Sequence, residues 1–378
     1  MIGFVPRGSV AQSVEQRPFK ALVVGSSPTR PTIVLISLGL VTWVIASLAI
    51  AQAQPQGART GLQPDVVFTD YTPLSGAAEI TRRLMSPLNA LRVTRVLQRS
   101  GTTLRDQVID LSHEKFAVYV PAREPPEGYS LLVFVPPWPQ AEVPRKWIPT
   151  LDRHGTIFVS AANSGNEADV LDRRDPLALL AAENIKRRYR IDPLRVYVGG
   201  FSGGARIALR LALGYPDVFT GALLDAGSDP IGSAEIPLPP AELLWRVQEA
   251  TRVVYVTGAR DESHLQMDVA SRRSLESWCV FDLVTLDMPW VAHELAAAGA
   301  FNSALRALED RKPVAASKLS TCRAHLEGEV ASQLDQVERL DAAGNRTDAR
   351  GLLQKLDARF GGLVGTRGIQ LAERLGAQ

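Results

Sequence analysis

The sequence has few of the residues that build metal centres or disulfide frameworks. Its 378 residues include two cysteines, Cys279 and Cys322, and five histidines. The cysteine spacing is not that of a metal site, and a chain of this length does not depend on a disulfide framework. In an oxidising compartment the two cysteines can pair and tie the C-terminal segment to the core. Two separate buried thiols are the alternative.

The chain also lacks an excess of charge of either sign. Residues 1–53 contain four of the 42 basic residues and one of the 40 acidic residues, which leaves 38 and 39 in the remainder. This balance predicts neither a nucleic acid nor an anionic membrane surface as a partner. With 46% hydrophobic and 22% charged residues, the composition is that of a globular protein. The length allows one large α/β domain with an appendage.

The N-terminal 53 residues contain an uncharged apolar run over residues 33–50, followed by Ala51-Gln52-Ala53. A hydrophobic run that ends in Ala-x-Ala predicts a secretory signal peptide over residues 33–53, with cleavage after Ala53. The alternative is a membrane anchor that is not cleaved. Residues 1–32 resemble the peptide obtained by translating a transfer-RNA gene. We therefore interpret them as a spurious upstream extension of a bacterial gene.

The most informative stretch is Gly200-Phe201-Ser202-Gly203-Gly204. It follows a β-branched and aromatic run and precedes residues 205–213, which have high helix propensity. Gly-x-Ser-x-Gly at a strand-to-helix turn is typical of a nucleophile elbow, in which Gly200 and Gly204 leave room for a strained serine. The alternative is an ordinary glycine-rich turn. We predict Ser202 as a nucleophile.

Strands and helices alternate from residue 130 to residue 310, which predicts a mostly parallel sheet covered by helices on both faces. The expected strands are residues 108–111, 116–120, 131–135, 156–160, 196–198, 221–225, 252–256 and 281–286. The expected helices are residues 77–85, 88–98, 176–190, 205–213, 241–249, 265–277, 294–308, 324–340, 347–360 and 369–375.

This pattern divides the chain into three parts after the signal peptide. Residues 54–104 are predicted to be a linker and an N-terminal helical segment, and residues 105–310 are the α/β domain. Residues 311–378 form a C-terminal helical segment, which is too short for a solenoid and is expected to pack on the core.

A serine nucleophile needs a base and an orienting acid, which follow it along the chain in this kind of fold. His293 lies on the loop after the last strand and is the predicted base. His264 is interpreted as a cap or rim residue and His325 as a solvated one, whereas His113 and His154 precede the serine. Asp261, just past a buried strand, is the predicted acid.

Asp225 and Asp229 are the alternatives to Asp261, which could also be an ordinary turn residue. The oxyanion of an acyl-transfer reaction needs two N–H donors. Gly203 is expected to supply one. Trp138 is expected to supply the other, since Pro136, Pro137 and Pro139 have no N–H.

These residues carry a family resemblance. Gly200 to Gly204, Asp261 and His293 resemble the α/β-hydrolase superfamily, and residues 188–200 resemble the secreted esterase branch of polyhydroxybutyrate depolymerases and feruloyl esterases. The resemblance covers residues 105–310. It implies the α/β-hydrolase fold and a serine carboxylesterase that uses no metal or cofactor. One departure is Pro136-Pro137, where that branch usually has His-Gly.

The sequence thus predicts an exported serine hydrolase that acts on a small or short polymeric ester. A peptidase or amidase of the same fold is one alternative. A catalytically silent scaffold that binds a partner through its C-terminal helices is the other.

Overall fold

The computed structural model describes residues 59–233, 235–311 and 313–376. The interpretations of residues 1–53 as an upstream extension and a signal peptide lie outside these residues. The described residues belong to one compact unit.

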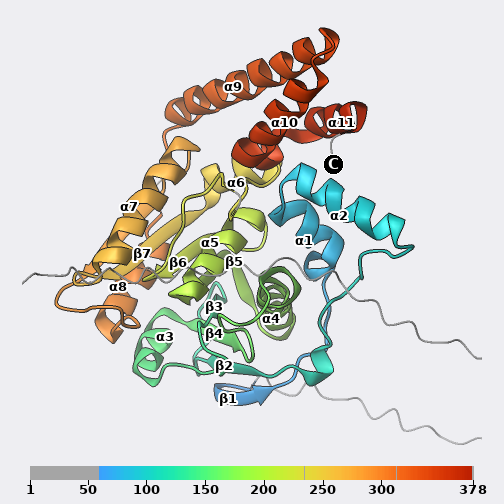
Figure 1. The fold of residues 1–378 in the computed structure, drawn as a ribbon. Coiled ribbons are helices and arrows are strands. Elements are labelled where there is room, and N and C mark those ends of the chain that lie inside the picture. The colour runs from blue at the N-terminus through green and yellow to red at the C-terminus, as the bar shows by residue number, and fades with distance from the viewer. Residues whose placement is uncertain (1–58, 234, 312, 377–378) are drawn as a thin grey trace, which may run out of the picture. The chain divides into compact units, whose positions relative to one another are not determined.

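The centre of this unit is an eight-stranded sheet (Figure 1). Its strands are β1 (Gly61–Val66), β2 (Phe116–Val120), β3 (Tyr129–Val135), β4 (Thr156–Ala161), β5 (Ile191–Phe201), β6 (Gly221–Asp225), β7 (Arg252–Gly258) and β8 (Leu283–Met288). The spatial order is β1-β2-β4-β3-β5-β6-β7-β8. β2 is antiparallel to both of its neighbours, and all other pairs are parallel. The carboxyl ends of β3 to β8 therefore lie at one edge of the sheet.

The α-helices of the described residues are distributed over both faces of the sheet and the C-terminal region. They are α1 (Ala77–Leu84), α2 (Pro87–Arg99), α3 (Ile148–His154), α4 (Asp175–Arg188), α5 (Gly203–Gly214), α6 (Ala241–Ala250), α7 (Glu262–Ser277), α8 (Ala298–Glu309), α9 (Ala316–Ala342), α10 (Arg346–Phe360) and α11 (Gly365–Leu375). Most overlap the predicted helices, although α9 begins eight residues earlier than expected, α11 begins four residues earlier and α8 begins four residues later. The helix α3 was not predicted.

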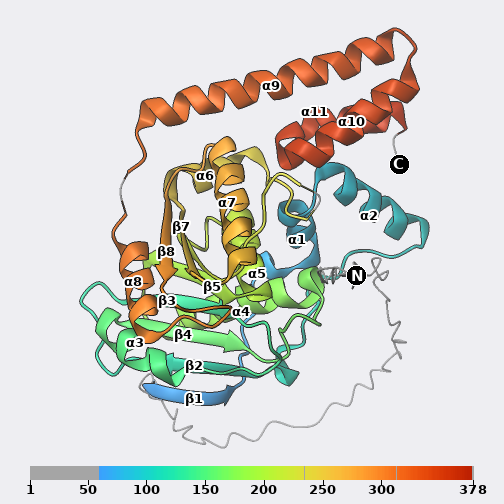
Figure 2. The same ribbon diagram turned by 60° about the vertical axis from the view of Figure 1, so that its left-hand side comes forward.

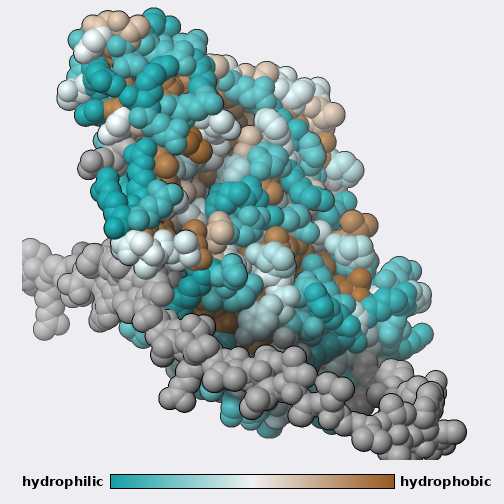
Figure 3. Space-filling model, turned by 90° about the vertical axis from the view of Figure 1, so that its right-hand side faces the viewer, coloured by the Kyte–Doolittle hydropathy of each residue, from teal (hydrophilic) through white to brown (hydrophobic). Residues whose placement is uncertain are grey.

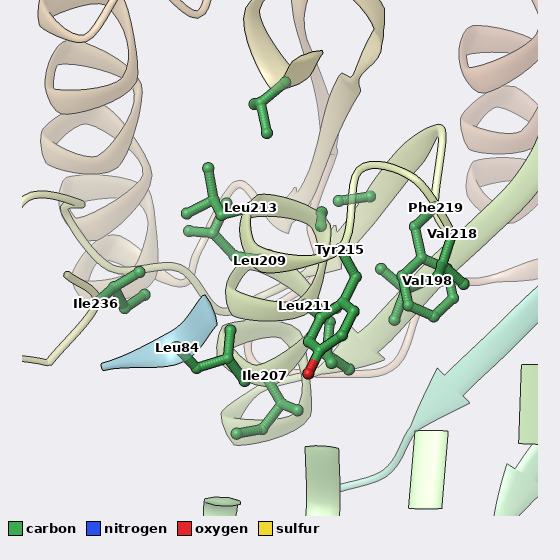
Figure 4. Packing of buried hydrophobic residues seen from close by; sticks show 14 of the residues in the cluster. Leu84, Val198, Ile207, Leu209, Leu211, Leu213, Tyr215, Val218, Phe219 and Ile236 are labelled. Carbon is green, nitrogen blue, oxygen red and sulfur yellow. The ribbon is translucent and has the colours of Figure 1, made fainter. Parts of the chain in front are cut away.

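Each face of the sheet has its own hydrophobic core because side chains alternate along a strand. Along β3, Leu131 and Val133 join the core beneath α4 and α5, whereas Leu132 and Phe134 join the core beneath α3 and α8. Figure 4 shows part of the first core around α5, where buried leucines of that helix lie among side chains of other segments such as Leu84, Val198 of β5 and Ile236. The helix after Ser202 is therefore held firmly on the sheet.

This strand order, with β2 antiparallel and helices on both faces, is that of the α/β-hydrolase fold. The predicted fold class is confirmed, but two details of the sequence interpretation are wrong. Residues 108–111 form no strand. Their apolar side chains still contribute to the core, since Ile109 is buried there from an irregular segment. Instead β1, inside the stretch interpreted as a linker, pairs with β2 at the sheet edge. An edge position tolerates Pro64, which has no N–H for the ladder.

The C-terminal helices α9, α10 and α11 pack on one another and extend the first core (Figure 2). A disulfide joins Cys279, which follows α7, to Cys322 of α9. Near α6, Arg323 of α9 donates hydrogen bonds to Gln248 and to the backbone oxygen of Trp245. Pairing of the two cysteines, which the sequence left open, thus fastens the helical segment to the α/β domain.

A buried carboxylate of α10 makes a second set of contacts between the C-terminal helices and the rest of the protein. Asp357 of α10 accepts hydrogen bonds from the Ser86 hydroxyl and from the Leu88 N–H, which lies in the first turn of α2. Gly362 N–H donates to the backbone oxygen of Leu238 at 2.8 Å. The C-terminal segment therefore contacts both the N-terminal helical segment and the α/β domain.

The surface of the described residues is mixed in polarity. On the face drawn in Figure 3, most of these residues are hydrophilic and the hydrophobic ones form small separate groups. Within the described part of the chain, we find no helix with both the length and the apolarity needed to cross a membrane.

Candidate active site

Ser202 occupies a strained turn between β5 and α5. Its backbone has φ +54° and ψ −122°, a conformation that non-glycine residues rarely adopt. A Cβ at Gly200 would collide with the backbone of Gly204, and a Cβ at Gly204 would collide with the carbonyl of Val135. Ser202 N–H donates to the Asp225 carbonyl at 2.8 Å, which fixes the turn to β6. This is the geometry that the Gly-x-Ser-x-Gly pattern predicts.

The structure brings Ser202, His293 and Asp261 together. The distance from His293 Nε2 to Ser202 Oγ is 3.0 Å, and that from His293 Nδ1 to Asp261 Oδ2 is 2.7 Å. Because an ionised carboxylate only accepts hydrogen bonds, we assign the proton to Nδ1. Nε2 is then free to accept the proton of the Ser202 hydroxyl. The side chain of His293 is 39% exposed and is therefore accessible to solvent.

The loop that carries His293 has no regular structure and is held by contacts on either side. Three residues beyond His293, Ala296 N–H donates to the Asp225 carboxylate at 2.8 Å, and the Ala296 carbonyl accepts from Trp147 Nε1 at 2.8 Å. Phe201 stacks on the imidazole of His293, with ring centroids 4.8 Å apart. The position of His293 thus depends on groups from β5, β6 and the segment before α3.

Asp261 is the N-cap residue of α7 and is 7% exposed. Burial opposes ionisation of its carboxyl. Hydrogen bonds from His264 and His293 outweigh burial and hold the pKa of Asp261 below its ordinary value. The carboxyl is therefore ionised at neutral pH, as an orienting acid requires.

His264 also belongs to this cluster, which sequence reasoning missed. Its Nδ1 lies 2.8 Å from Asp261 Oδ1, and its ring stacks on that of His293 with centroids 4.2 Å apart and an interplanar angle of 16°. The available signal was the spacing Asp-x-x-His at Asp261 and His264, which is also that of a helix cap. Nothing local in the sequence predicts the contact with His293.

The two alternative acids have other partners. Asp225 is fully buried and bonds the backbone of Ala296, and burial raises its pKa to about 8. Asp229 lies 3.6 Å from Arg206 Nε, and burial raises its pKa as well. Asp261 is thus the carboxylate that contacts His293.

The loop predicted to complete the oxyanion site lies against the start of α5. The Pro136 carbonyl accepts from buried Arg174 Nη2 at 3.1 Å, and the Pro137 carbonyl accepts from Asn166 N–H at 3.0 Å. The indole of Trp138 packs near Phe201, with ring centroids 6.2 Å apart. The backbone of this loop is therefore held next to the elbow, while the donor role of Trp138 N–H stays a prediction.

Asn166 is a second residue that sequence reasoning missed. A Cβ at position 203 would collide with its exposed side-chain amide unless that amide rotated away. Asn166 follows β4, and polar residues after parallel strands gather at one sheet edge. That is the signal that could have identified it.

The other histidines lie away from Ser202. His154 contacts Glu309 and Asn302, His113 contacts Asp110, and His325 is exposed on α9.

Among the described residues, one group has metal-ligand atoms close together, namely Asp261, His264 and His293, whose atoms lie within 4.8 Å of one another. A metal ion binds in the plane of an imidazole ring. The two stacked, nearly parallel rings do not share a plane, so this arrangement fits hydrogen bonding to the carboxylate better than coordination.

Comparison with known proteins gives one short sequence match and several distant structural ones. A 45-residue stretch is 51% identical to poly(3-hydroxyalkanoate) depolymerase C of Paucimonas lemoignei, covering 12% of this chain and 11% of that protein. The predicted resemblance to depolymerases is therefore confirmed over a stretch that is about a tenth of that relative's length. No family model matches the sequence.

Solved structures with a similar fold include esterases and a peptidase. Est1E of Butyrivibrio proteoclasticus is 16% identical, with a TM-score of 0.40 over 52% of this chain and 94% of its own. A ferulic acid esterase is 14% identical, with a TM-score of 0.38 over 51% and 89%. Dipeptidyl peptidase 4 of Porphyromonas gingivalis is 14% identical, with a TM-score of 0.40 over 53% of this chain and 34% of that peptidase.

Proposed function

We propose that the protein is a serine hydrolase that cleaves carboxylic esters through an acyl-enzyme. The observation that carries the proposal is the continuous hydrogen-bonded chain from Ser202 Oγ through His293 to Asp261. Ser202 is the nucleophile, His293 the general base and acid, and Asp261 the group that orients the imidazole.

In the acylation step, Ser202 Oγ forms a bond to the ester carbonyl carbon while its proton moves to His293 Nε2. The negative charge that develops on the carbonyl oxygen is stabilised by the N–H groups of Gly203 and Trp138. His293 then returns the proton to the departing alkoxide oxygen as the carbon–oxygen bond of the ester breaks. The alcohol leaves and the acyl group stays on Ser202.

Deacylation repeats these steps with water. His293 takes a proton from the water as its oxygen attacks the acyl carbon, and then returns the proton to Ser202 Oγ. Asp261 stays ionised and stabilises the imidazolium that forms in each half-reaction. None of these steps calls on a metal or a cofactor.

A series of p-nitrophenyl esters with acyl chains from C2 to C12 tests this proposal. We expect turnover by the wild type and its loss in Ser202→Ala, and the optimal chain length measures the acyl site. p-Nitroanilide substrates, run in parallel, separate an esterase from an amidase or peptidase. A folded wild type without turnover on either substrate class would favour the silent-scaffold alternative.

We also propose that the protein is exported from a bacterial cell. The apolar run with Ala51-Gln52-Ala53 and the Cys279–Cys322 disulfide support this, because stable disulfides form mainly outside the cytosol. N-terminal sequencing of protein from the periplasm or medium should begin at Gln54. Retention of the whole chain in the membrane fraction would favour the uncleaved anchor.

A further inference from the structure

Asp261 is shared between two imidazoles. Its Oδ2 accepts from His293 Nδ1 at 2.7 Å, and its Oδ1 accepts from His264 Nδ1 at 2.8 Å. The proposed reaction requires the hydrogen bond between Asp261 and His293. It does not require the hydrogen bond between Asp261 and His264, so that bond has a separate role.

The ring of His264 also makes a second, independent contact. It stacks on His293 at 4.2 Å, while Phe201 stacks on His293 at 4.8 Å. Both neighbours are nearly parallel to the His293 ring, with interplanar angles of 16° and 28°. The imidazole of His293 is thus restricted in rotation by two aromatic groups, although its loop has no regular structure and its side chain is 39% exposed.

We propose that His264 is a positioning residue that fixes the carboxylate of Asp261 and the ring plane of His293 for proton transfer with Ser202. The inference rests on the proposed function and adds to it a fourth residue that acts through two of the others.

Sharing the carboxylate has a geometric consequence. His264 holds one oxygen of Asp261 and His293 holds the other, so the carboxylate cannot rotate without losing a hydrogen bond.

Other charged groups face His264 from the elements around it. Asp268 of α7 and Asp229 after β6 both feel its charge, and Arg206 of α5 lies 3.6 Å from Asp229. Arg260 and Glu262 flank Asp261 in the chain. The substitutions below leave these groups in place but remove the contribution of His264 to the charge around Asp229 and Asp268.

Two substitutions separate the two contacts of His264. His264→Phe keeps a planar ring beside His293 but has no donor for Asp261. His264→Gln keeps a donor but has no ring.

His113 offers a matched control because it repeats the same local arrangement. It bonds Asp110, three residues earlier in the chain, at 3.0 Å, and its side chain is 81% exposed and takes no part in the site. His113→Phe therefore tests the loss of an ordinary histidine–aspartate cap pair.

The experiment measures kcat and KM on a p-nitrophenyl ester between pH 5 and pH 9. A fluorophosphonate probe counts active sites, so that kcat refers to folded enzyme. We expect His264→Phe to lower kcat on the order of tenfold, with KM within about twofold of the wild type, because misplacement of a catalytic group costs rate rather than binding. His264→Gln should also lower kcat with little change in KM, and His113→Phe should match the wild type.

The inference is overturned if His264→Phe and His264→Gln both reproduce the wild-type kcat across this pH range. It is also overturned if they only lower the number of active sites, since that would be a structural role. A wild type that neither turns over nor reacts with the probe would contradict the proposed function itself, and the inference with it.

Discussion

Replacing Asp225 by asparagine should stabilise the protein at neutral pH, and the free-energy difference from the wild type should grow with pH. Asp225 is fully buried at the end of β6, and one of its carboxylate oxygens has no hydrogen-bond partner. Burial raises its pKa from 3.8 to about 8. At neutral pH the folded protein therefore holds this carboxyl protonated, whereas the unfolded chain has it ionised.

The size of the effect follows from this pKa difference. The pKa of Asp225 is higher in the folded than in the unfolded state. Its ionisation therefore costs no stability below about pH 4, and the cost grows as the pH rises towards 8. Since one pKa unit corresponds to about 1.4 kcal/mol, the cost is roughly 2 kcal/mol at pH 5 and about 4 kcal/mol at pH 7. Asparagine does not titrate, so Asp225→Asn avoids this cost at every pH.

The amide of asparagine keeps an acceptor for Ala296 N–H but adds a buried donor. An unpaired donor costs about 1–3 kcal/mol, and this penalty does not vary with pH. The test is therefore how the free energy of unfolding of the variant, relative to the wild type, changes with pH, and not its value at a single pH. Urea unfolding at pH 5, 6, 7 and 8 should show the free-energy difference between variant and wild type rising by about 2–3 kcal/mol from pH 5 to pH 7. Parallel pH curves would refute the account of Asp225.

Two further predictions concern the disulfide and the elbow. Replacing Cys279 and Cys322 by serine should lower the free energy of unfolding by about 4 kcal/mol, which is the loop-entropy value for a separation of 43 residues. Activity on a small ester should persist in the folded state. An unchanged urea midpoint would contradict this prediction. Gly204→Ala should destabilise the protein by about 1–3 kcal/mol and reduce ester hydrolysis, because the new methyl group collides with the backbone carbonyl of Val135. Gly203→Ala should cost less, because its methyl group meets the exposed side chain of Asn166, which can rotate away. Equal instability of the two variants would argue against this distinction.

The parts of the structure that depend on local pattern could be predicted from the sequence. The elbow has its glycines and serine within five residues, and Asp261 and His293 each follow an apolar strand by a short loop. The buried strands β3, β4, β6 and β7 are continuous apolar runs. Parallel topology then places their carboxyl ends at one edge, which explains why the predicted site residues meet there.

The parts that depend on distant partners could not be predicted. β1 is a polar strand containing Pro64, and its partner β2 lies about fifty residues later. The contact of His264 with His293 depends on how the start of α7 approaches a loop beyond β8. Similarly, Asp357 has the pattern of a solvated helical residue, and only the position of α2 explains its burial.

The central claim is that Ser202 is the nucleophile of this site. Its most direct test is the reaction of the folded protein with a fluorophosphonate, followed by mass spectrometry of the intact chain and its peptides. The account predicts a single adduct on the peptide that contains Ser202, much slower labelling in His293→Ala and none in Ser202→Ala. An adduct on another residue, or a folded wild type that does not react, would contradict it.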